Sequence, residues 1–249
     1  MIFLYDNLID NSSSVLSANS ENANYPADFV KDYHLSAAFR STQASTVWLM
    51  VDFGSTGEAY DMGAIAGHNI SSTATIKIQG ASSSAFGATD FDYAITGSTG
   101  DLFSKFSTQG SQYVRILVND ASNTDGYIEI GRFMVGSRLE LTRGFRDAFT
   151  ETDTDTSEVM FSVTGQPFGV RGYRAREYDL DFPRWEDSIK RNLDTMIDTV
   201  RNYKPVFTVL DETNSTSLPP VYGVFVQPFN PSHRVNYKWY GRLKIRETF

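Results

Sequence analysis

A dense apolar run in the first half of the chain, Val47-Trp48-Leu49-Met50-Val51, most constrains the fold. It ends at Asp52-Phe53-Gly54, and a run this short, bounded by Gly and Ser, is typical of a buried strand. A second apolar segment, Met62 to Ala66, follows and ends at Gly67-His68-Asn69. The stretch 47–69 therefore predicts two strands, with Trp48 in the core because it lies in the middle of the apolar run.

Further strands are expected on both sides of this stretch. Residues 75–80 and 113–118 alternate apolar and polar side chains, as half-buried strands do, and residues 127–141 supply the last strand or two of the unit. Aromatic residues make up 14% of the chain, which suits a β-architecture in which rings pack on pleated surfaces. These patterns therefore predict a mainly β structure for the first half of the chain.

The order of these segments resembles that of discoidin-like (galactose-binding-like) domains. In that family a Trp-containing strand ends in Asp-Leu-Gly, where this chain has Asp52-Phe53-Gly54. Residues 32–41 match the segment before that strand, and residues 112–116 and 128–136 match the closing strands. Two departures are the absence of cysteine and the presence of Phe39 where the family has Trp. The resemblance implies a jelly-roll β-sandwich over roughly the first half of the chain.

The second half of the chain contains one amphipathic helix among strands. A helix over 184–203 is predicted, because Pro183 precedes it, Pro205 stops it, and apolar residues recur at helical spacing. These apolar residues are Trp185, Ile189, Leu193, Met196, Ile197 and Val200. Strands are expected at 159–163, 173–182, 206–210, 221–226 and 237–246.

Strands, a single helix and further strands in this order resemble the tail-tube fold of tailed bacteriophages, which their distal tail proteins share. That resemblance implies a β-sandwich or barrel flanked by one helix, whose subunits join edge to edge into a ring. It favours a hexamer, with a trimer as the alternative. We therefore expect a discoidin-like domain at 1–140, an acidic linker or loop at 141–158, and a tail-tube-like domain at 159–249.

Charge and composition exclude several functions. The net charge of −8 argues against binding a nucleic acid backbone, which requires clustered Lys and Arg. The absence of cysteine excludes disulfides, thiolate nucleophiles and cysteine-ligated zinc. The N-terminus lacks the basic region of a secretory signal, and no apolar run approaches ~20 residues, so no membrane span is expected.

Catalytic motifs are missing from the sequence. The three histidines, His34, His68 and His233, are scattered, and no nucleophile elbow, phosphate-binding loop or dinucleotide fingerprint occurs. Asp153 and Asp155 lie in an acidic segment that lacks the Gly and Glu of a calcium-binding EF-hand loop. Asp28 and Asp32 could help a loop to bind calcium, but their spacing does not define a site. We expect no enzyme activity, no cofactor and no metal site.

Two sets of polar residues have alternative interpretations. His68 and Asn69 could hydrogen-bond vicinal sugar hydroxyls from a rim loop, or they could satisfy backbone groups at their own turn, the favoured reading. The basic side chains Lys238, Arg242, Lys244 and Arg246 alternate with apolar ones along a strand. They could form a solvated face, the default, or contact the acidic loop around Asp153 of a neighbouring subunit.

The sequence therefore favours a structural virion protein of a bacteriophage tail tip or baseplate, a ring component like the distal tail protein. Its expected partners are copies of itself and other tail proteins, and its location is the phage tail, assembled in the host cytoplasm. The alternative is a carbohydrate-binding module that mediates attachment to host glycans. A glycan-cleaving enzyme is a distant third hypothesis, which requires two of the acidic residues to converge in space.

Overall fold

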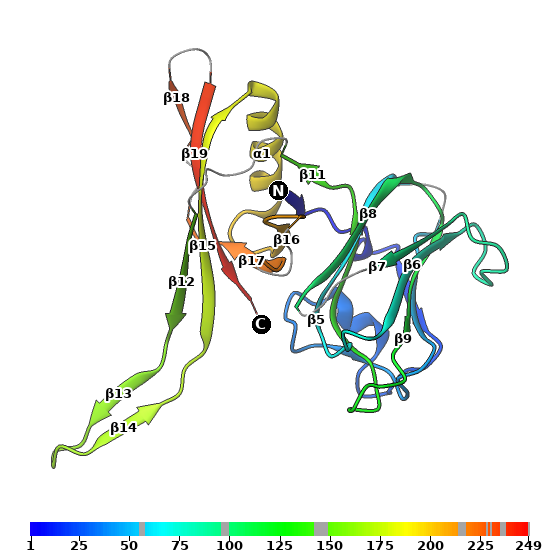
Figure 1. The fold of residues 1–249 in the computed structure, drawn as a ribbon, viewed down its shortest axis with the longest axis horizontal. Helices are drawn as coiled ribbons and strands as arrows, with labels where there is room; N and C mark the ends of the chain where they lie inside the picture. The colour runs from blue at the N-terminus through cyan, green and yellow to red at the C-terminus, as the bar shows by residue number, and fades with distance from the viewer. Residues whose placement is uncertain are drawn as a thin grey trace. The chain divides into compact units, whose positions relative to one another are not determined.

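The computed structural model describes residues 1–54, 58–95, 100–141, 149–213, 218–227, 229, 231–234 and 238–248, with only the backbone of 183, 184, 233, 234 and 238. The fold is mainly β, with antiparallel sheets and a single α-helix in the described residues, which confirms the predicted class (Figure 1). The chain forms two compact units. The first contains Met1–Thr142, Val206–Tyr222 and Phe249, and the second contains Arg143–Pro205 and Gly223–Thr248.

The first unit is a β-sandwich of two antiparallel sheets. One sheet has the order β2 (Val15–Ala18), β4 (Val47–Asp52), β9 (Tyr113–Asn119), β6 (Thr75–Ala81) and β7 (Phe91–Ile95). The other has the order β3 (Phe39–Arg40), β10 (Glu129–Gly136), β5 (Tyr60–His68) and β8 (Leu102–Gln109). Side chains from the facing sides form one apolar core, which includes Leu49, Val51, Ile65, Ile116 and Phe133. This is the sandwich that the first half of the sequence predicts.

Strand β4 differs from its prediction in one respect. Val47, Leu49 and Val51 are buried, but Trp48 and Met50 are only partly buried. Successive side chains of a strand point to opposite faces, so only alternate residues of this continuous apolar run can reach the core. Trp48 lies on the other face, opposite Leu117 of β9. The prediction that Trp48 is a core residue is therefore wrong.

A third layer covers the outer side of the β5–β10 pair. It consists of β11 (Leu139–Glu140), β1 (Ile2–Leu4) and β16 (Val206–Val209), in that order. A second apolar cluster forms there and includes Ile2, Leu4, Met62, Met134 and Phe207. Strand β16 was expected in the C-terminal domain, but it pairs with β1, and its buried side chains complete the first unit.

The second unit is built on two long antiparallel strands, β15 (Arg174–Trp185) and β19 (Lys238–Glu247). The short β18 (Ser232–Arg234) and residues 223–225 of β17 (Val221–Phe225) pair with β19, while β12 (Phe149–Asp155) pairs with β15. Beyond β12 the chain forms a hairpin of β13 (Glu158–Phe161) and β14 (Pro167–Val170). The structure thus differs from the acidic linker or loop expected at 141–158, because threonines alternate with acidic residues in β12 and suit a strand.

Helix α1 (Asp187–Val200) lies within the predicted range 184–203 but is shorter. Leu193, Met196 and Val200 are buried, as the apolar stripe predicts. Trp185, expected in the helix, is instead the last residue of β15 and is buried. Its ring occupies the space above Gly241, where an added Cβ would come within 2.7 Å of it. None of the helices described is long and apolar enough to cross a membrane.

Candidate functional site

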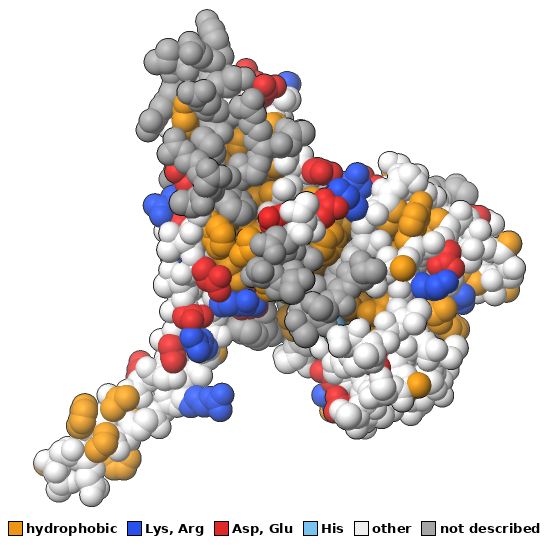
Figure 2. All heavy atoms as spheres, viewed as in Figure 1, with side chains coloured by type: hydrophobic (Ala, Val, Ile, Leu, Met, Phe, Trp, Pro, Cys, Tyr) orange, Lys and Arg blue, Asp and Glu red, His pale blue; other side chains and the backbone are white. Residues whose placement is uncertain are grey.

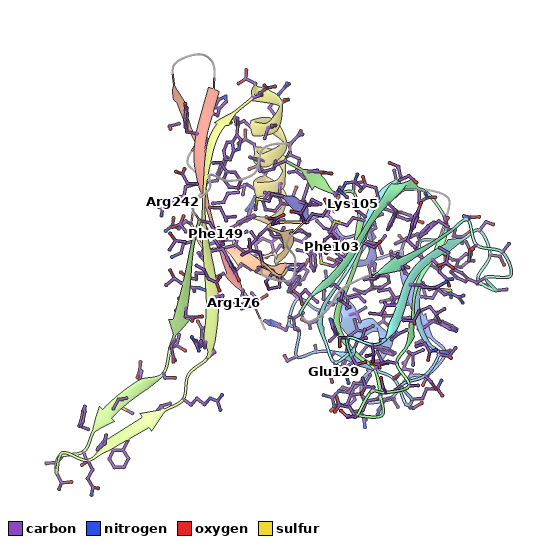
Figure 3. All side chains as sticks on the ribbon, viewed as in Figure 1. Phe103, Lys105, Glu129, Phe149, Arg176 and Arg242 are labelled. Carbon is purple, nitrogen blue, oxygen red and sulfur yellow. The ribbon has the colours of Figure 1, made fainter. Side chains whose placement is uncertain are left out.

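Several loops of the sandwich meet at one end of the first unit. The pairings of Val47 with Val118, Thr75 with Asn119 and His68 with Ile130 place the connections 41–46, 69–74 and 120–128 at this end. Figure 3 shows the labelled Glu129 there, at the start of β10. Loops held by a rigid sandwich are common positions for binding residues.

The central feature of this end is the guanidinium of Arg40. It lies 4.1 Å from the ring centre of Tyr25 and 5.3 Å from that of Tyr127. Its Nε is 2.5 Å from a carboxylate oxygen of Glu129, and the two side chains remain 32% and 28% exposed. Burial alone would lower the pKa of Arg40, but the carboxylate of Glu129 outweighs it and raises that pKa. Arg40 is therefore charged at any physiological pH. We call Tyr25, Arg40, Tyr127 and Glu129 the Arg40 cluster.

Backbone hydrogen bonds fix the members of the Arg40 cluster. Arg40 and Glu129 are opposite residues of β3 and β10. The backbone N–H of Arg40 donates to the carbonyl of Tyr25 (3.1 Å). Ser41 next to Arg40 exchanges two hydrogen bonds with Ile128, through its N–H (2.9 Å) and its hydroxyl (2.8 Å). The side chains are thus presented by a preorganised backbone.

Polar groups of the Arg40 cluster are available to a ligand. In the part of the chain that the structure describes, the terminal nitrogens of Arg40 and the hydroxyls of Tyr25 and Tyr127 make no hydrogen bond. A guanidinium provides several donors in a planar fork, and a phenol can donate and accept. Together with the Glu129 carboxylate, the cluster can hydrogen-bond several hydroxyl groups of one small ligand.

The predicted site residues His68 and Asn69 lie at the same end, and their polar atoms bond within the fold. The Nε2 of His68 is 2.8 Å from the carbonyl oxygen of Gly100, and its Nδ1 accepts from the N–H of Ile70. Those partners assign the neutral tautomer with the proton on Nε2, and burial lowers the pKa of His68. His68 therefore ties the turn after β5 to the start of β8, as the backbone-satisfying interpretation expects.

Asn69 holds the loop that carries Tyr127. Its amide nitrogen donates to Asp125 (2.9 Å) and to the carbonyl of Tyr127 (3.0 Å), and its oxygen accepts from the N–H of Glu129. Asp120 fixes the other side of this loop by accepting from the N–H and hydroxyl of Ser71. Burial alone would raise the pKa of Asp120, but these hydrogen bonds hold it below its usual value. Direct sugar contact by His68 and Asn69 stays a prediction.

The segment that contains Asp28 and Asp32 is a short 3-10 helix, Ala27–Lys31, with Asp32 directly after it, and the side chain of Arg132 holds it. Nη1 of Arg132 donates to the carbonyl of Val30 (2.9 Å), between the two aspartates in sequence. Asp28 faces Lys31, and Asp32 accepts from the N–H of His34. No group of three acidic or histidine side chains that could hold a metal occurs among the described residues.

The basic stripe of β19 has acidic partners in its own sheet. Lys244 and Arg246 both pair with Glu177 of β15. Arg242, labelled in Figure 3, pairs with Asp179. Asp153, expected to attract a neighbour's stripe, pairs with Arg174. The side chain of Lys238 lies outside the described residues. The stripe is thus largely neutralised within one chain, and an intersubunit role for it stays a prediction.

Comparison with known proteins gives structural neighbours for about half of the chain. No protein-family model matches, and no curated protein matches. Chitosan-binding module 1 of a chitosanase/glucanase from Paenibacillus sp. IK-5 is 20% identical, with 52% of this chain and 98% of the module aligned at a TM-score of 0.40. The family 32 carbohydrate-binding module of NanJ from C. perfringens, solved with galactose, is 16% identical over 56% of this chain and 100% of its own, with a TM-score of 0.42. The lectin domain of lectinolysin, solved with Lewis B antigen, is 14% identical over 53% of this chain and 96% of its own, with a TM-score of 0.41. Likenesses this distant transfer no function.

Nothing in these comparisons supports the expected likeness of the C-terminal half to tail-tube proteins, and the virion role and ring remain predictions. Sequence reasoning also missed the Arg40 cluster. Arg40 and Glu129 lie in segments that match the discoidin-like pattern, but Tyr25 and Tyr127 lie in separate loops. Only the pairing of β3 with β10 brings these segments together.

Proposed function

We propose that the first unit is a non-catalytic carbohydrate-binding module whose ligand contacts the Arg40 cluster. The observation that supports this most is a partly exposed guanidinium beside two tyrosine rings, with its terminal donors unused. Sugars present vicinal hydroxyl groups and apolar C–H faces, which guanidinium, carboxylate and aromatic groups complement. No acid–base or nucleophile pair is needed for this activity.

Binding to a glycan array tests the proposal directly. Arg40→Gln removes charge-assisted hydrogen bonds worth about 1.5–3 kcal/mol, so we expect affinity for the bound glycan to fall about 10- to 100-fold. Tyr127→Ala removes the ring but leaves the backbone carbonyl that holds Asn69. Tyr203→Ala is the matched control, because Tyr203 is an exposed tyrosine of the second unit.

Two outcomes would count against the proposal. One is a silent array with protein whose circular dichroism and melting are normal. The other is a glycan signal that Arg40→Gln and Tyr127→Ala leave at the wild-type level, which would place the sugar elsewhere. Tyr25→Phe adds a finer test, because it removes only a hydroxyl and should lower affinity without changing the melting temperature.

A further inference from the structure

The hairpin of the second unit leaves large apolar side chains uncovered on both of its faces. Met160 and Phe168 are opposite residues of β13 and β14 and are 54% and 55% exposed, while Phe161 on the other face is 70% exposed. Val159 and Val170 are also exposed. Figure 2 shows hydrophobic side chains in orange along this hairpin. We call residues 158–170 the arm.

An isolated two-stranded hairpin is at best marginally stable in water, and contiguous exposed apolar side chains mark interaction surfaces. Each of the five apolar side chains named above exposes roughly 100 Å², taking 150–250 Å² for a fully covered aromatic ring as the scale. Two or three of them lie on each face, so one face offers ~200–300 Å². A standard protein interface buries about 800 Å² on each partner. One face of the arm can therefore supply the apolar centre of an interface, with polar neighbours around it.

The same unit contains an apolar cavity of about 290 Å³ at the C-terminal end of α1. Ile197, Phe225, Val226 and Phe229 provide its apolar lining, and Asp198 and Arg201 also line it. Its volume is at the lower limit of about 300 Å³ for small-molecule sites, which suits one or two protein side chains. We call it the α1 pocket.

The arm and the α1 pocket each present one acidic and one basic side chain. Glu158 begins the arm and Arg171 directly follows it, and Asp198 and Arg201 line the pocket. None of these four side chains has a salt bridge within the described residues. Two opposite pairs can therefore form when the arm enters the pocket, and complementary charges of this kind set orientation in an interface.

We propose that the arm of one copy docks its apolar side chains into the α1 pocket of a second copy. The arm cannot reach its own pocket, because the β12–β15 ladder carries it away from α1 within the second unit (Figure 1). Arm and pocket are different surfaces of one subunit, so the contact is heterologous. It generates a closed cyclic assembly if the rotation between copies closes, and a filament if it does not.

Disulfide trapping tests the contact cleanly, because the full chain contains no cysteine. One variant carries Gly169→Cys on the arm, where an added Cβ meets nothing within 4 Å. The other carries Asn202→Cys, at an exposed position that lines the pocket. Mixed under mild oxidation, the two should form a cross-linked dimer. In the control, Gly87→Cys is mixed with Asn202→Cys instead. An added Cβ at Gly87 also meets nothing within 4 Å, but Gly87 lies in the first unit.

Sedimentation of the full chain gives the second readout. Phe161, on the same face of the arm as Gly169, provides the variant. Phe161→Lys should raise the dissociation constant for self-association by about 10-fold or more, as loss of a central apolar anchor does. Cross-linking no stronger than in the control, or a monomer at every concentration with Phe161 intact, would overturn the proposal. Preferential linkage of Gly169→Cys copies to one another would replace it with arm-to-arm pairing. Binding of the monomer to phosphatidylcholine vesicles, abolished by Phe161→Lys, would replace it with a lipid surface.

Discussion

Arg132 and Asp10 form an ion pair inside the first unit. Nη2 of Arg132 lies 2.6 and 2.5 Å from the two carboxylate oxygens of Asp10, and the arginine side chain is only 2% exposed. The same guanidinium donates to Val30 and lies 5.1 Å from the ring centre of Tyr33. One buried cation thus joins strand β10 to the short helices η1 (Leu8–Asp10) and η2 (Ala27–Lys31).

Asp10→Ala should therefore destabilise the first unit strongly. Removing one partner of a buried ion pair leaves the other charge without compensation, which costs about 3–5 kcal/mol. Urea unfolding measures the loss. The matched control is Asp28→Ala, because Asp28 is 74% exposed and 3.8 Å from its partner Lys31, and the change should cost less than about 1 kcal/mol. Equal effects of the two variants would mean that the Arg132 contact does not hold these elements together.

Variants of Asn69 and Tyr25 distinguish a residue that positions a loop from one that contacts the ligand. Asn69→Ala breaks the hydrogen bonds to Asp125, Tyr127 and Glu129, so both the melting temperature and glycan affinity should fall. Tyr25→Phe breaks no described hydrogen bond and should lower affinity alone. Calorimetry and the glycan array measure the two quantities. Loss of affinity in Asn69→Ala at unchanged stability would instead support direct sugar contact by Asn69.

His68 should make stability depend on pH. Burial lowers the pKa of His68 in the folded state below its ordinary value of 6.5. As the pH falls through this range, the imidazole is therefore protonated more in the unfolded chain than in the folded one. Stability from this residue is thus complete above the ordinary pKa and declines as the pH falls toward the lower folded-state pKa. His68→Gln removes the titration. The free energy of unfolding of the wild type should fall relative to that of the variant between pH 7.5 and 5.5, and parallel profiles would contradict the assignment.

The helix tests how well periodicity predicts burial. Leu193 is fully buried and Asn192 is exposed. Leu193→Asp should destabilise the second unit by ~3 kcal/mol or more, because it buries an unpaired charge. Asn192→Asp, with a similar change of charge on the outer face, should alter stability by less than about 0.5 kcal/mol. Thermal melting followed by circular dichroism compares them, and similar losses in both would refute the helical phase.

Local patterns predicted the elements that depend on local physics. The spacing of Leu193, Met196 and Val200 identified the buried face of α1, and alternation identified β6 and β9. Packing partners that are distant in sequence could not be predicted from local patterns. Nothing near Phe207 indicates that it packs with Ile2 and Leu4, and nothing near Trp185 indicates that its ring needs Gly241. Trp48 was misplaced because hydrophobicity alone does not say which face of a strand meets the core.

The same limit applies to the candidate site and to the basic stripe. The Arg40 cluster combines three separate segments, so its geometry exists only after β3 pairs with β10. The sequence suggested an intersubunit contact for the basic side chains of β19, Arg242, Lys244 and Arg246. It does not show that β15, with its acidic residues, lies beside β19. In the fold, Glu177 is directly opposite Arg246, and the charges of the two strands offset each other.

Glu177 therefore provides the last prediction. Its carboxylate is almost completely buried, and it accepts from Lys244 Nζ and Arg246 Nε, both at 2.5 Å. The hydrogen bond from Lys244, and after it that from Arg246, outweigh burial and lower the pKa of Glu177. Glu177→Gln leaves two cations without their shared anion, and we expect a loss of about 1–3 kcal/mol at pH 7.

The sign of the pH dependence follows from the lowered pKa of Glu177. Its contribution to stability is complete above the ordinary carboxyl value of 4.5 and is lost as the pH falls through the lower folded-state pKa. Urea unfolding from pH 7 to 3 should show the wild type and Glu177→Gln converging in acid. Glu21→Gln, at an exposed position of the first unit, is the control and should follow the wild type throughout. A gap between wild type and Glu177→Gln that stays constant down to pH 3 would mean that the ion pairs do not stabilise the β15–β19 pair.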